Sequence, residues 1–108
     1  MFSLYTWAMV LIGMLDSPYV RRCAISMKMM GITFEHRPLS VFRHFDEFRK
    51  VNPVVKAPTL LCDDGTVLMD STLILDYIES IAPAQKRLMP AEVGTRKLAL
   101  RLIGLASA

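Results

Sequence analysis

Apolar and polar positions recur with two different periods in the first half of the chain. Residues 9–15, MVLIGML, form an apolar run typical of a strand buried on both faces. Helical spacing follows, with apolar residues at Val20, Cys23, Ala24, Met27 and Met30. Gly31 is a natural helix end, and residues 32–39 predict a second strand ended by Pro38. We expect a βαβ unit with parallel strands.

The second half of the pattern predicts two further helices and a hairpin. Residues 41–50 favour a short helix, and residues 51–61 carry two prolines and lead into a strand. Two apolar strands flank Asp63-Asp64-Gly65, and Asp-Gly is a favoured two-residue hairpin turn. Residues 71–83 predict the clearest helix. Its expected apolar face consists of Leu73, Ile74, Tyr77, Ile78 and Ile81. The order βαβαββα, an α/β fold with a mixed four-stranded sheet, matches the thioredoxin architecture.

The two ends of the chain lie outside this pattern. We interpret residues 1–8 as an extension outside the fold, residues 9–82 as the thioredoxin-like domain and residues 83–90 as a linker. Residues 91–108 restart a helical pattern and predict the first helix of a truncated, all-helical domain. Its apolar stripe consists of Leu98, Leu102 and Leu105, with Ile103 and Ala106 beside it. An uncovered stripe accounts for the 53% share of hydrophobic residues.

Charge and cysteine usage exclude several classes of function. The net charge of +3 comes from basic residues that are scattered along the chain, which argues against a nucleic-acid partner. Cys23 and Cys62 form no CxxC pair, so neither a metal site nor a dithiol redox pair is predicted. The apolar N-terminal run stops at Asp16, short of the roughly 20 residues that span a membrane. We therefore predict a cytoplasmic protein with no membrane or metal partner.

Ser17 has two interpretations. Serine followed by proline is a preferred start of a helix, so local structure alone explains Ser17-Pro18. The same geometry favours an anion such as a thiolate, because a helix N-terminus carries free N–H groups and partial positive charge. A hydrolytic triad is disfavoured, since His36 and His44 are the only histidines and no GxSxG motif surrounds Ser17.

Two more segments have both a structural and a functional interpretation. In KAPTL, residues 56–60, Pro58 is either an ordinary proline at the start of a strand or part of a cis Ala57-Pro58 bond that presents the Ala57 backbone. In MDSTL, residues 69–73, Ser71 is a good helix N-cap. Asp70 and Ser71 together also suit an amino-acid zwitterion, with a carboxylate for the ammonium group and a hydroxyl for the carboxylate.

The segments SPYVRR, NPVVKAPTL and DGTVLMDSTLILDYIE resemble the N-terminal domain of the glutathione S-transferases, in particular bacterial, zeta-like and theta-like members that use serine. The resemblance implies a transferase, usually a homodimer, in which glutathione is the co-substrate and a small electrophile is attacked. Ser17 would activate the glutathione thiol, and Ala57 before Pro58 would pair with the cysteinyl part. Asp70 and Ser71 would hold the γ-glutamyl end.

Four details of this resemblance are less regular. Lys56 stands near the peptide as a lesser contact, and Asp70 replaces the more usual glutamate. The glycyl carboxylate has no assigned residue, although Arg43 and Lys50 have suitable charge. The segment 91–108 is only the start of the helical domain that would bind the electrophile.

Two other classes of function stay open. One is a non-catalytic binding module that resembles the transferases, such as stringent starvation protein A. The other is a thiol oxidoreductase that uses Cys23 or Cys62, although helical and strand positions favour both as core residues.

Overall fold

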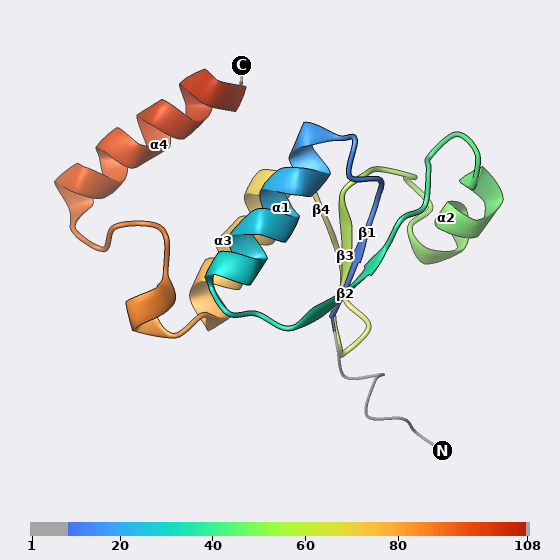
Figure 1. Cartoon of the computed structure of the whole chain (residues 1–108), viewed down its shortest axis with the longest axis horizontal. Helices are drawn as coiled ribbons and strands as arrows, with labels where there is room; N and C mark the ends of the chain where they lie inside the picture. Colours follow the sequence, from blue (N-terminus) through green and yellow to red (C-terminus); the bar gives the residue numbers. More distant parts are fainter. Residues whose placement is uncertain (1–8, 108) are drawn as a thin grey trace.

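Four strands form one mixed sheet in the computed structural model, which describes residues 9–107 (Figure 1). They are β1 (Met9–Ile12), β2 (Phe34–Arg37), β3 (Thr59–Leu61) and β4 (Val67–Met69). In the order β2-β1-β3-β4, β1 is parallel to β2 and antiparallel to β3, which is antiparallel to β4. The predicted thioredoxin-like order is therefore confirmed, while the extension expected at residues 1–8 lies outside the described residues.

The helices cover both faces of this sheet. They are α1 (Pro18–Met29), α2 (Phe45–Val51), α3 (Ser71–Ile81), the short 3₁₀ helix η2 (Ala84–Lys86) and α4 (Val93–Ser107). Helices α1 and α3 lie side by side on one face, and α2 lies on the other (Figure 1).

The core lies on both sides of β1. Leu11 packs toward α1 and α3 in a cluster with Val20 and Ile74. Val10 and Ile12 face the other way and pack against Phe48 of α2. All three β1 side chains are buried, so the prediction of a strand buried on both faces is confirmed. The loop that follows β1 therefore begins at the end of an inner strand that is packed on both faces.

Several predicted boundaries and faces differ from the structure. Strand β1 ends at Ile12 because Gly13 has a φ of 145° and turns the chain. The hairpin loop contains three residues rather than two, since Cys62 N–H bonds the carbonyl of Thr66. On α3, Ile74 and Ile78 are buried as expected.

The apolar face predicted for α3 included two residues that the structure leaves exposed. Leu73 is 62% exposed and Ile81 is also exposed, because α3 meets the sheet along a narrow stripe.

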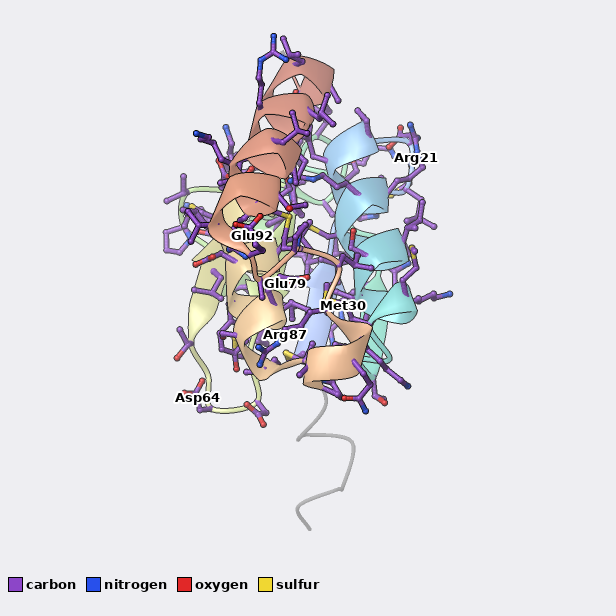
Figure 2. The ribbon with its side chains drawn as sticks, turned by 90° about the vertical axis from the view of Figure 1, so that its left-hand side faces the viewer. Arg21, Met30, Asp64, Glu79, Arg87 and Glu92 are labelled. Atoms are coloured by element: carbon purple, nitrogen blue, oxygen red, sulfur yellow. The ribbon has the colours of Figure 1, made fainter. Side chains whose placement is uncertain are left out.

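Helix α4 packs only lightly on the rest of the molecule. None of its described residues is buried, and the predicted stripe of Leu98, Leu102 and Leu105 is exposed. Two other α4 residues, Leu100 and Ile103, line a hollow of about 340 Å³ that residues of α1 and α3 also line. The segment before α4 is tied to α3 by Glu79, labelled in Figure 2, whose carboxylate accepts hydrogen bonds from the backbone N–H groups of Leu88 and Met89. Assignment of residues 91–108 to a second domain stays a prediction.

Within residues 9–107, every helix is too short or too polar to cross a lipid bilayer.

Candidate functional site

The sheet topology brings the three predicted segments to one edge. Ile12, the last residue of β1, pairs with Thr59, the first residue of β3. Thr59 in turn pairs with Met69, the last residue of β4. The segments that follow Ile12, precede Thr59 and follow Met69 therefore emerge beside one another. These segments contain Ser17, the Lys56-Ala57-Pro58 stretch and the Asp70-Ser71 pair, but not Arg43 or Lys50.

Gly13 allows the first segment to turn closely over α1. Its φ of 145° lies in the region that L side chains rarely adopt. A Cβ at this position would lie 2.6 Å from Val20 Cγ2 and 3.3 Å from the Ala57 Cβ. The backbone is held from the other side by β2, because the Gly13 N–H donates to the Arg37 carbonyl over 3.0 Å. His36 Nε2 also lies 2.7 Å from the Gly13 carbonyl oxygen and donates to it.

Ser17 is the N-cap of α1, as predicted. Its Oγ accepts a hydrogen bond from the Val20 N–H over 3.4 Å, and Pro18 occupies the first helical position. This cap is long for a hydrogen bond and therefore weak. Among the described residues, no acceptor takes the hydroxyl proton of Ser17. The half-exposed hydroxyl thus keeps a free donor beside the positive end of α1.

The Ala57-Pro58 peptide bond is cis, as one of the two interpretations expected. Pro58 also directly precedes β3, so its place at the start of a strand holds as well. Pro58 is buried and Ala57 is half-buried. In the described part of the chain, neither the N–H nor the carbonyl of Ala57 has a hydrogen-bond partner. Both backbone groups are thus available to an extended ligand. Lys56, exposed beside them, adds a positive charge.

Asp70, rather than Ser71, is the N-cap of α3. Its Oδ1 accepts from the Thr72 N–H over 2.9 Å, and helix α3 begins at Ser71. The prediction that Ser71 is the cap was therefore wrong. Asp70 has a φ of 78°, a conformation that aspartate tolerates better than most residues. Ser71 is only 5% exposed.

Arg22 of α1 is a neighbour that sequence reasoning missed. Its Nη1 donates to Ser71 Oγ and to Thr72 Oγ1, each over 3.1 Å. Arg22 belongs to the motif SPYVRR, but it lies 49 positions before Ser71 in the sequence. No pattern along the chain identifies such a pair.

A hollow of about 370 Å³ opens at the same edge of the sheet. Ser17, Lys56 and Ala57 line it, together with a loop that the sequence analysis did not single out. This loop contributes Leu39, Ser40, Val41 and Phe42. Asp70, Ser71, Arg43 and Lys50 do not line the hollow. The structure thus joins Ser17, Lys56 and Ala57 in one hollow and leaves the Asp70-Ser71 pair at the neighbouring strand end.

The two cysteines behave as core residues. Burial raises the pKa of the Cys23 thiol to about 12, with the nearby charge of Arg22 acting in the opposite direction. Burial also raises the pKa of Cys62, with the Asp64 charge acting in the same direction. Neither thiol is a thiolate at neutral pH, which argues against a thiol oxidoreductase. Among the described residues, no group of His, Cys, Asp and Glu is arranged to hold a metal ion.

The family model for the N-terminal domain of glutathione S-transferases matches residues 11–86. The chain belongs to the glutathione S-transferase family. An uncharacterized GST-like protein of Escherichia coli, YibF, is 35% identical over 86 residues, which cover 78% of this chain and 43% of YibF. A probable maleylacetoacetate isomerase 2 of Drosophila melanogaster is 34% identical over 80 residues, 69% of this chain and 34% of that protein.

Solved structures of glutathione S-transferases have the same fold. The crystal structure of a glutathione S-transferase from Methylobacillus flagellatus with glutathione bound superposes with a TM-score of 0.82 and 25% identity. The match covers 93% of this chain and 49% of that one. The chain therefore spans less than half the length of these transferase relatives.

Proposed function

We propose that this edge of the sheet binds glutathione and activates its thiol for attack on an electrophilic carbon. One observation carries the proposal: Ser17 and Ala57 line the same hollow, and both keep hydrogen-bonding groups without a partner among the described residues. A hydroxyl donor beside a helix N-terminus suits a thiolate. An unpaired backbone N–H and C=O suit a peptide.

Each residue has a chemical role in this proposal. The Ser17 hydroxyl donates a hydrogen bond to the glutathione sulfur and stabilises its anion. The Ala57 backbone pairs with the cysteinyl residue, and Lys56 attracts the anionic peptide. The Asp70 carboxylate accepts from the γ-glutamyl ammonium group, while Ser71 donates to the carboxylate of the same end. The thiol proton leaves to solvent, the sulfur forms a bond to carbon, and the displaced group departs with its electrons.

The energies are sufficient for this role. Lowering a thiol pKa by one unit requires about 1.4 kcal/mol of preference for the anion. A hydrogen bond to a charged group supplies about 1.5–3 kcal/mol, and a helix terminus adds about 0.3–1 kcal/mol. We expect a bound thiol pKa that is one to two units below its usual value of about 8.5.

The test is a titration of the whole chain with glutathione by calorimetry, followed by ultraviolet absorbance of the bound thiolate against pH. We expect measurable binding and a lowered thiol pKa in the wild type. Ser17→Ala should lose the shift, Ser17→Thr should retain most of it, and Ser80→Ala, on the exposed end of α3, should have no effect. No heat of binding would instead support a non-catalytic binding module.

The proposal also includes a small electrophile as the second substrate. A homodimer, a bacterial source and a cytoplasmic location stay predictions. Conjugation of glutathione to a chlorodinitrobenzene probe by the wild type, and its loss in Ser17→Ala, would support transferase activity of this chain.

A further inference from the structure

We propose that Arg22 is a positioning residue that makes the site selective for a ligand with a carboxylate at its γ-glutamyl end. The inference rests on the proposed glutathione site and adds a residue from a different element. Arg22 lies on α1, five residues after Ser17, whereas the other residues of the proposed γ-glutamyl site lie at the start of α3.

The first observation behind this proposal is the direction of the hydrogen bond between Arg22 and Ser71. A guanidinium has only donors, so Ser71 Oγ must act as the acceptor in its 3.1 Å contact with Arg22 Nη1. A serine hydroxyl has a single proton, and that proton is then left for another acceptor. Arg22 therefore orients the hydroxyl as a donor toward whatever lies beyond it. A carboxylate oxygen accepts such a bond, whereas an ammonium group does not.

The second observation is that the charge of Arg22 has no partner within the described residues. The ion pairs among residues 9–107 are Arg37 with Glu35 and Arg49 with Asp46, so Arg22 is in none of them. Its Nε and Nη2 groups make no hydrogen bond within the described structure. The positive charge of this half-buried guanidinium favours an anion next to the hydroxyl that it orients.

The third observation is that the start of α3 offers separate groups for the two charges of a zwitterion, a carboxylate for its cation and hydrogen-bond donors for its anion. Asp70 supplies a carboxylate one residue before Ser71, and its Oδ1 is fixed by the Thr72 N–H. The N–H of Ser71 has no partner in the part of the chain that the structure describes. Arg22 and this N–H together favour an anion, and Asp70 favours a cation. An α-amino acid group carries both charges.

Packing between α1 and α3 holds Arg22 in place. The neighbouring Cys23 is fully buried, and its sulfur lies 4.0 Å from the Ser71 carbonyl oxygen. The backbone of α1 is thus fixed against the start of α3 at the residue next to Arg22. A longer or shorter basic side chain at this position would not reach both hydroxyls with the same nitrogen.

The test compares two ligands that differ only in the group concerned. Glutathione has the γ-glutamyl carboxylate, and 4-aminobutyryl-cysteinyl-glycine lacks it but keeps the ammonium group, the thiol and the glycyl end. Calorimetry on the wild type, Arg22→Gln, Arg22→Lys and Lys28→Gln would give the dissociation constants for both. Lys28 is an exposed cation on the same helix, so Lys28→Gln removes the same charge away from the site.

We expect Arg22→Gln to weaken glutathione binding about 30-fold, equivalent to about 2 kcal/mol, and to change binding of the shortened ligand less than about twofold. Arg22→Lys should show an intermediate loss, because it keeps the charge but not the two-hydroxyl contact. Lys28→Gln should change neither ligand. Thermal unfolding of each variant shows whether the fold is kept, and Arg22→Lys serves if Arg22→Gln does not fold.

Equal losses for both ligands would overturn the inference, because a merely structural role of Arg22 affects both alike. No loss for glutathione would also overturn it, and both results leave the glutathione site itself standing. If the wild type binds neither ligand, the proposed function fails and the inference fails with it.

Discussion

The side-chain amide of Asn52 donates a hydrogen bond to the hydroxyl of Thr59 over 3.0 Å, and both side chains are buried. The Asn52 Oδ1 accepts from the Val54 N–H over 3.0 Å, and the Thr59 hydroxyl donates to the Lys56 carbonyl. One buried amide thus holds both ends of the segment that contains Ala57. The shape of this part of the site depends on a residue outside it.

Replacing Asn52 by alanine should lower the free energy of unfolding by about 2–3 kcal/mol, because buried partners lose their hydrogen bonds and a small void forms. Urea unfolding would measure the loss. Thr59→Val removes only the hydroxyl at nearly constant volume and is the matched variant. The double variant should cost less than the sum of the two single ones; strict additivity would show that the two side chains act independently.

Gly13→Ala should destabilise the fold by about 2–4 kcal/mol, because alanine disfavours the positive φ and its Cβ meets Val20. Gly104→Ala is the control. Gly104 lies in α4 with no atom near its added Cβ, so alanine there should be neutral or stabilise by up to about 1 kcal/mol. Thermal denaturation of both variants would test the contrast, and an equal effect at the two positions would contradict it.

Asp70→Asn should separate the structural role of Asp70 from its proposed binding role. Asparagine also caps helices and tolerates positive φ, so we expect the free energy of unfolding to change by less than about 0.5 kcal/mol. Loss of the carboxylate should weaken glutathione binding about tenfold, or about 1.4 kcal/mol. Asp70→Ala should lose the cap as well and destabilise by about 1 kcal/mol. Unchanged glutathione affinity in Asp70→Asn would remove the ammonium contact from the proposal.

Cys23 should make stability depend on pH in the alkaline range. Its thiol pKa is about 12 in the folded chain and near 9.0 without burial. Below about pH 9 both states hold the proton, so this group adds no pH dependence. Between about pH 9 and 12 the unfolded chain releases the proton and the folded chain keeps it, so the free energy of unfolding falls as pH rises.

The slope from this single group is at most about 1.4 kcal/mol per pH unit. Comparison of urea unfolding of the wild type and Cys23→Ala across that range would isolate it, since Cys62 and Tyr77 are present in both proteins. The same slope in the two proteins would show that the thiol is not held neutral by the fold.

Periodicity predicted the element order because each element has a clear pattern of its own. The buried positions of α1 and the cap at Ser17 followed from the order and spacing of residues within this one segment of the chain. The cap of α3 was wrong because Asp70 and Ser71 are both good caps, and only the backbone decides between them. Arg22 and the loop of residues 39–42 were missed because their role depends on which segments the sheet brings together.

The proposed binding edge and the β3–β4 turn lie at opposite ends of the sheet. Arg21 at the start of α1 and Asp64 in the β3–β4 turn lie far apart along the molecule (Figure 2), and all the candidate ligand contacts lie at the Arg21 end. The Asp64 turn is exposed, and apart from the adjacent residues no atom lies within 4 Å of a Cβ added at Gly65. We therefore expect that the chain can be opened, extended or labelled at that turn, for example to attach a fluorophore or to create new termini, without changing the proposed binding edge.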